Sequence, residues 1–99
     1  MNNASAASTS FTVYVVCGDK PAGYVIVSTV GGNNWSQDQT MMTATCPSAA
    51  PVVLGGGGIS SSSSTSVNMW DSVADQNRSW TATENNASAT FYALAICIS

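Results

Sequence analysis

The sequence predicts an all-β protein: one small antiparallel sandwich, barrel or prism of seven to eight short strands. The first reason is that helix formers are scarce, since the 99 residues include only two Leu, one Lys and one Glu, which are residues that favour helices. The second reason is that apolar runs of strand length recur at short intervals between turn residues. A chain of this length suits one core, and no internal linker is visible, so we expect a single domain over residues 1–99.

The first expected strand covers residues 11–17 and follows a polar segment, residues 1–10. One face of this strand carries Phe11, Val13 and Val15, and the opposite face is also apolar. A strand that is apolar on both faces is normally central and covered on both sides. We therefore expect residues 11–17 to lie in the middle of a sheet.

The next two strands are bounded by turn residues. Residues 18–23 form a turn cluster in which Gly23 is free to take a positive φ, and a strand over residues 24–30 follows it. Side chains alternate in type over residues 40–46, and Pro47 ends that strand.

The second half of the chain continues in the same style. A short apolar run at residues 51–54 leads into four glycines, residues 55–58, where neighbouring strands or a bulge can approach closely. The serines at residues 60–64 indicate a loop or a sheet edge. Two further strands are expected over residues 79–84, with one wet face, and over residues 90–98, apolar on both faces.

The chain opens with a copy of the element that closes it. The residues Asn2–Ala6 recur unchanged as Asn85–Ala89, and an apolar run that ends in cysteine follows each copy, at residues 11–17 and 91–97. Such repetition indicates a unit that follows another unit, either in tandem or by assembly.

Composition excludes two classes of partner. The net charge is −3 with only two cationic side chains, whereas nucleic-acid binding needs clustered Lys and Arg. No apolar run approaches the roughly 18 residues of a spanning helix, so we expect no membrane insertion. Low charge and abundant polar neutral residues are typical of extracellular proteins and of proteins packed into assemblies. No signal peptide is visible, so either it was removed or the protein leaves the cell by another route.

The chemistry of common active sites is also excluded. The sequence contains no histidine, which removes Ser-His-Asp and Cys-His pairs and the commonest metal ligand. Three cysteines without a Cys-x-x-Cys motif do not supply the four ligands of a zinc site. An enzyme would have to use Asp71, Asp75 or Glu84 as paired carboxylates. A solvated loop explains these acids better, so we expect no enzyme, no metal and no cofactor.

One polar loop could bind sugars. Aromatic rings stack on the apolar faces of pyranose rings, while amides and carboxylates bond to hydroxyl groups. A tryptophan in a polar loop is not needed for folding, although tryptophans also cap the ends of thin cores. The candidate sugar-binding residues are Asn33, Asn34, Trp35, Gln37 and Asp38.

Three cysteines suggest an oxidising compartment, with one cysteine left over. Three buried, reduced thiols remain the alternative, because free cysteine packs like a small hydrophobic residue.

Several short motifs occur in an order that resembles a known family. They are PAGYVIVS at residues 21–28, TATCP at 43–47, VLGGG at 53–57, SWTAT at 79–83 and YALAIC at 92–97. This order resembles a β-rich repeat unit of secreted actinobacterial proteins, whose pattern runs GYxVV, TCPAG, VLGGG, GWT and YAICA. The resemblance covers residues 21–98. Such units are tandem extracellular modules of no settled activity, so the resemblance implies a location and an architecture.

The resemblance also implies a role for each cysteine. Cys46 and Cys97 would form the disulfide of the unit, and residues 11–17 would correspond to the end of a preceding unit. Cys17 is then the odd cysteine, either buried and free or paired with a thiol of a neighbouring subunit. The chain departs from the pattern at residues 48–50, which read SAA in place of Ala-Gly-Lys, so the turn there is expected to differ.

These observations predict a non-enzymatic structural subunit of an extracellular assembly, such as a surface layer, a fibre or a virion decoration. It would self-associate through β-strands with neighbouring copies, as a homo-oligomer. The candidate assembly strand contains Phe11, Val13 and Val15, and it would pair either within its own sheet or with a neighbour by strand addition. The alternative is a carbohydrate-binding, lectin-like module that takes glycans at Trp35.

Overall fold

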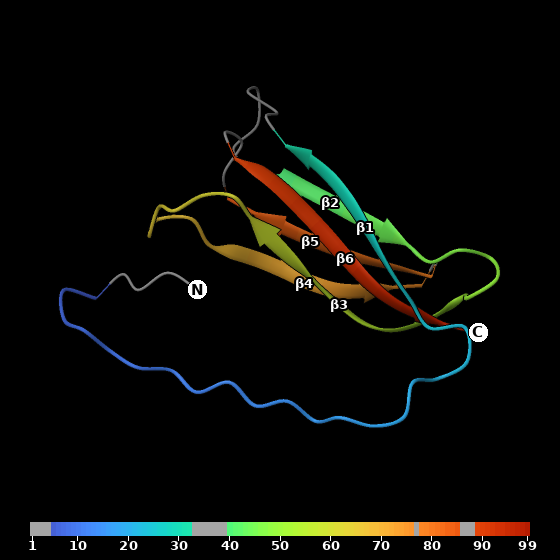
Figure 1. Ribbon diagram of the computed structural model, residues 1–99. Helices are drawn as coiled ribbons and strands as arrows, with labels where there is room; N and C mark the ends of the chain where they lie inside the picture. Colours follow the sequence, from blue (N-terminus) through green and yellow to red (C-terminus); the bar gives the residue numbers. More distant parts are fainter. Residues whose placement is uncertain (1–4, 33–39, 77, 86–88) are drawn as a thin grey trace.

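The structure is a computed structural model, and it describes residues 5–32, 40–76, 78–85 and 89–99. Within these ranges the chain forms six β-strands and no helix (Figure 1). The strands are β1 (Val25–Gly32), β2 (Thr40–Thr45), β3 (Val52–Ser60), β4 (Met69–Asp75), β5 (Ser79–Glu84) and β6 (Thr90–Ile98).

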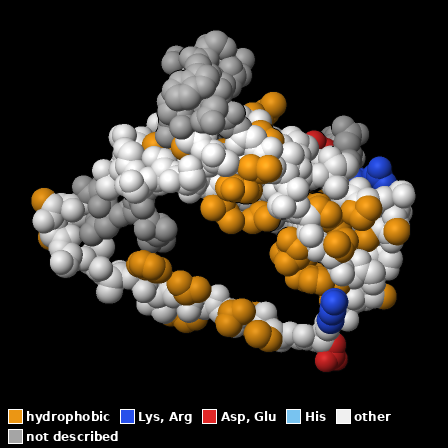
Figure 2. All heavy atoms as spheres, turned by 45° about the horizontal axis from the view of Figure 1, so that its top comes forward, with side chains coloured by type: hydrophobic (Ala, Val, Ile, Leu, Met, Phe, Trp, Pro, Cys, Tyr) orange, Lys and Arg blue, Asp and Glu red, His pale blue; other side chains and the backbone are white. Residues whose placement is uncertain are grey.

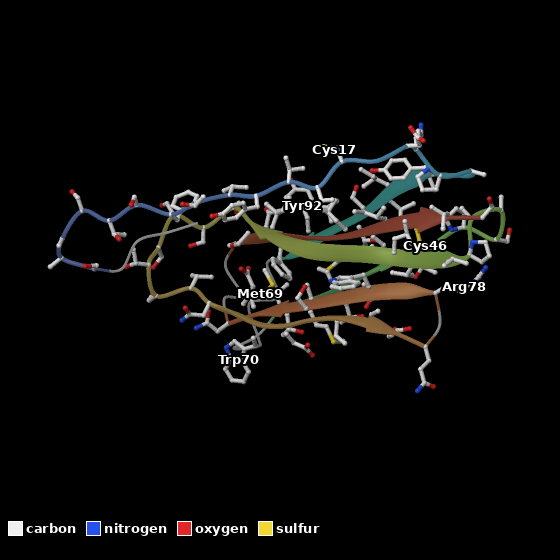
Figure 3. The ribbon with its side chains drawn as sticks, turned by 90° about the horizontal axis from the view of Figure 1, so that it is seen from below. Cys17, Cys46, Met69, Trp70, Arg78 and Tyr92 are labelled. Atoms are coloured by element: carbon white, nitrogen blue, oxygen red, sulfur yellow. A yellow bond between two sulfur atoms is a disulfide. The ribbon has the colours of Figure 1, made fainter. Side chains whose placement is uncertain are left out.

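The strands build two antiparallel sheets of three strands each. Sheet A has the order β1-β6-β3 and sheet B the order β2-β5-β4. The last two strands of the chain are therefore the central strands of the two sheets. Viewed edge-on, the sheets lie one above the other (Figure 3). The all-β prediction is confirmed, and the arrangement is that of a sandwich.

The core between the sheets is made of small residues. Ala44 and Ala82 from sheet B and Ala93 and Ala95 from sheet A are fully buried, and Phe91 is the largest buried side chain. Small side chains allow two sheets to approach closely, since sheet spacing is set by the residues between them. The core is consequently thin, and the apolar area that it removes from water is modest.

A disulfide joins the two sheets across this thin core. Cys46 directly follows β2, Cys97 lies in β6, and both residues are buried. Their Cα atoms are 5.7 Å apart, and they are separated by 51 positions in the sequence. This is the pairing that the family resemblance implied.

The strand count is smaller than predicted, because residues 11–17 form no strand in the structure. They were expected to be central and covered, yet all of them are exposed and pair with no described strand. The central place of sheet A is taken by β6, which has the same apolar pattern. If residues 11–17 took the place of residues 91–97, Val13 and Val15 would stand at the positions of Ala93 and Ala95, which are fully buried. The larger side chains would overpack this thin core.

The glycines at residues 55–58 do not end a strand; they lie inside β3. The register of β3 against β6 shifts between Val53 and Gly55, as expected for a bulge. A Cβ atom on Gly58 would lie 2.6 Å from Phe91 Cζ and 2.9 Å from Ala82 Cβ, so the close approach predicted for these glycines is confirmed. The turn before β1 was also predicted correctly, since Gly23 has a φ of 68°.

Candidate functional site

The N-terminal segment is the part of the molecule least accounted for by the fold. Residues 5–20, here called the arm, run alongside the body and join neither sheet (Figure 1). The apolar side chains of the arm are exposed, from 62% for Phe11 to 99% for Val16. Cys17, at the end of this apolar stretch, is an exposed free thiol. Within the described part of the chain, nothing covers the apolar side chains of the arm.

The root of the arm is held in place. The backbone N–H of Tyr24 donates to the Pro21 carbonyl at 3.3 Å, and the backbone N–H of Ser99 donates to the Ala22 carbonyl at 3.2 Å. The Ser99 hydroxyl donates to the same Ala22 carbonyl at 3.0 Å. Lys20 Nζ lies 5.3 Å from the centroid of the Tyr24 ring, within the range of a cation–π contact. The arm therefore leaves from a fixed point beside the end of β6.

The outer face of sheet A is apolar. Residues that pair across antiparallel strands share a face, and the inner positions of β6 are its buried residues. Neither β1, β3 nor β6 contains a charged residue. Figure 2 shows hydrophobic side chains gathered on the body and along the arm. The outer face consists of Ile26, Ser28, Val30, Val52, Gly55, Gly57, Ile59, Tyr92, Leu94, Ile96 and Ile98.

The outer face of sheet B is polar. The hydroxyl oxygens of Thr43 and Thr81 lie 2.8 Å apart, which is a hydrogen bond across β2 and β5. A second rung joins Thr45 and Ser79 at 3.0 Å. Both hydroxyl pairs are partly buried. Met41 and Val73 also lie on this face, but its hydroxyl groups make it more polar than the outer face of sheet A.

The three acids considered for catalysis do not converge. Asp71 and Asp75 pair with Thr83 and Ser79, which places both on the outer face of sheet B. Glu84 belongs to the opposite face and is buried, with 1% exposure. The alternation of side chains along the strands separates Glu84 from the two aspartates.

Glu84 borders a cavity of about 440 Å³ at one end of the sandwich. Within the described part of the chain, neither carboxylate oxygen of Glu84 has a hydrogen-bond partner. The sequence placed Glu84 in a solvated position, but Glu84 continues the alternation of Trp80 and Ala82, which face the core. That alternation was the signal for its burial. The cavity is lined by Gly58, Ile59, Ser60, Ser62, Thr65, Val67, Asn68, Met69, Glu84 and Phe91.

Replacing Glu84 with methionine is expected to raise the free energy of unfolding by about 1–3 kcal/mol, since an unpaired polar group costs about that much to bury. Methionine adapts to the apolar part of the cavity around Met69 and Phe91. Urea unfolding of the two proteins at neutral pH measures the difference. Asp71→Asn, which removes a charge from an exposed position, is the matched control and should change stability by less than about 0.5 kcal/mol. A loss of stability in Glu84→Met would contradict this expectation, because it would show that the Glu84 carboxylate has hydrogen-bond partners in solution.

The remaining candidate residues can be placed only in part. The sugar-binding residues Asn33, Asn34, Trp35, Gln37 and Asp38 lie outside the described residues. So does most of the repeated pentapeptide, because residues 1–4 and 86–88 are not described. No cluster of three or more potential metal ligands occurs in the described ranges. The same ranges contain no helix long and apolar enough to cross a membrane.

No family model, curated protein or solved structure matches the chain.

Proposed function

We propose that the chain is a non-enzymatic structural subunit of an extracellular assembly, and that copies associate by adding the arm of one to a sheet of another. The observation that carries the proposal is the arm itself: its apolar side chains are exposed on both faces, and no described strand pairs with it. A surface layer, a fibre or a virion decoration are settings in which such a subunit works.

The energetics favour covering the arm. Full burial of one large apolar side chain contributes about 1.5–3 kcal/mol, and Tyr14, Val15 and Val16 are the most exposed large apolar residues of the described chain. Strand addition would also satisfy the backbone N–H and C=O groups of the arm, since an added strand bonds along its length to a sheet edge. The arm gains both contributions only when a sheet accepts it.

The interior of a neighbouring sandwich is not a suitable acceptor. A place equivalent to β6 is already filled, and it is lined by alanines that leave no room for valines. Addition at a sheet edge requires no displacement of β6. The domain therefore keeps its own fold while the arm binds elsewhere.

Two observations support an extracellular location. The Cys46–Cys97 disulfide is compatible with an oxidising compartment. The low charge, with two cations and five anions in 99 residues, fits a protein that functions packed against copies of itself.

Association should depend on the apolar character of the arm. The double variant Val13→Asp, Val15→Asp is expected to raise the dissociation constant of the assembly at least about 100-fold, because the added charges would have to be buried. Size-exclusion chromatography with light scattering, in a Cys17→Ala background that prevents cross-links and keeps the disulfide, measures the oligomeric state over a range of concentrations.

The matched control adds the same two charges elsewhere in the arm. Ser8→Asp, Ser10→Asp lies outside the apolar stretch and should assemble as the wild type does. A wild-type chain that stays monomeric at high concentration would contradict the proposal, as would equal association of the two double variants.

A further inference from the structure

We infer that the free edge of β3 accepts the arm of a second copy of this chain, an inference that rests on the proposed function and specifies its acceptor. Among the described residues, four strands have a free edge: β1 and β3 in sheet A, and β2 and β4 in sheet B. The four edges differ in charge, in bulk and in how open they are.

Charge and polarity together favour the edges of sheet A. Proteins protect exposed edges with charged residues and proline, and β4 carries Asp71 and Asp75. No charged residue and no proline occur in β1, β2 or β3. The outer positions of β2 carry threonine hydroxyl groups, however, whereas the outer face of sheet A is apolar. The apolar, uncharged stretch of the arm, residues 11–17, therefore fits an edge of sheet A better than an edge of sheet B.

The glycines distinguish β3 from β1. Gly56 and Gly58 face the core, where an added Cβ atom would meet Trp80 or Phe91, so packing explains them. Gly55 and Gly57 face outward, and a Cβ atom on either would meet nothing within 4 Å. The fold therefore gives no packing reason for these two outer glycines.

An added strand does give the outer glycines a use. Aromatic side chains on a neighbouring strand pack over edge glycines and shield the exposed backbone. The arm has one ring on each of its faces, Phe11 on one and Tyr14 on the other, so either face brings one ring to the outer glycines. The outer positions of β1 are already occupied by Ile26 and Val30, whose side chains cover the backbone that a ring would otherwise shield. The arm is therefore expected at β3 and not at β1.

The dimensions of the arm fit this edge. Its apolar stretch has seven residues, and β3 has nine. One apolar face of the arm would cover the side of the core next to Val53, and the other would extend the apolar outer face of sheet A. The occupant is a second copy because the arm is held at its root and leaves the outer residues Ile26, Val30 and Ile59 of its own sheet exposed.

The area is sufficient for a stable dimer. Two aromatic rings bury about 300–500 Å² per arm, and the valines add to this. Two arms exchanged between two copies then approach the roughly 1,600 Å² of a standard interface. A one-sided contact through a single arm would fall well short of that area.

The test uses a matched pair of lysines. Gly57 and Ser28 both flank Leu94 on the outer face, one on β3 and the other on β1. Gly57→Lys is expected to weaken association at least about tenfold, because its long side chain would fill the open space over the strand that the incoming ring needs. Ser28→Lys is expected to leave association unchanged. Equal weakening by both variants, or no weakening by Gly57→Lys, would overturn the β3 assignment; circular dichroism confirms that each variant is folded.

A cross-linking experiment locates the arm directly, with Cys17 as the native thiol. New cysteines are placed at Val52 or Ile59 on β3 and, as controls, at Ile26 or Val30 on β1; Ile59 and Val30 both pair with Tyr92. Mild oxidation should join Cys17 to β3 between copies and not to β1. Oligomers that cross-link only through β1 would overturn this inference while the proposed function stands. A strictly monomeric chain would overturn both.

Discussion

Removing the disulfide by the double substitution Cys46→Ala, Cys97→Ala is expected to lower the free energy of unfolding by about 4 kcal/mol. The value follows from the loop-entropy model for two cysteines separated by 51 positions. Small domains have a total stability of about 5–15 kcal/mol. The loss is therefore a large fraction of what holds this molecule together.

The structure explains why the disulfide carries so much of the stability. It links β6 of sheet A to the end of β2 in sheet B across a core made largely of alanine. Urea unfolding with and without reductant measures the effect in the wild type, and the double variant isolates it from Cys17. Cys17→Ala is the control. Because Cys17 is exposed, the free energy of unfolding of this variant should stay within about 0.5 kcal/mol of the wild-type value. A double variant as stable as the wild type would contradict the expectation.

Gly56→Ala is expected to destabilise the domain by about 1–3 kcal/mol or more, as overpacking of a tight core does. The added methyl group would meet the backbone carbonyl of Leu94 and the ring of Trp80. The carbonyl belongs to the central strand of sheet A and cannot move aside cheaply. Trp80 is also held, since its Nε1 donates to Ser72 Oγ at 2.9 Å.

The neighbouring substitution Gly57→Ala provides the comparison. Its methyl group points into open space, and alanine loses less backbone entropy on folding than glycine. Thermal unfolding should separate the two variants by at least about 4 °C, because 1 kcal/mol shifts the midpoint by about 4–8 °C in a domain of this size. Equal melting temperatures would mean that the two sheets are farther apart than the structure shows.

Strand alternation and turn residues predicted much of this fold. Residues 40–46, 79–84 and 90–98 were expected as strands and contain β2, β5 and β6. The four glycines were harder to interpret, because glycine has no side chain from which a pattern can be read. Only the register against β6 shows which of them face the core. Burial of Glu84 was missed for a different reason: its charge was given more weight than its place in an alternating strand.

The arm shows a limit of a different kind. Its apolar pattern correctly describes a segment that needs cover on both faces, but a pattern does not say whether the cover comes from the same chain. Residues 11–17 were expected to pair either within their own sheet or with a neighbouring copy, and the structure does not show the first of these, because β6 already occupies the central position of sheet A. The cysteine pairing came from the family resemblance, since three cysteines alone left several pairings open. The proposed sugar-binding loop lies outside the described residues and stays a prediction.

The contrast between the two sheet faces has a further consequence, in the terms of colloid chemistry. A slab with one apolar face and one hydroxyl-lined face is an amphiphile, and at a boundary between air and water the outer face of sheet A turns toward the air. Every copy adsorbed there has the same orientation, with its sheet edges pointing sideways. If copies associate as proposed, encounters between arms and edges would then be a search in two dimensions, so such a boundary would act as a template for growth of a film one molecule thick.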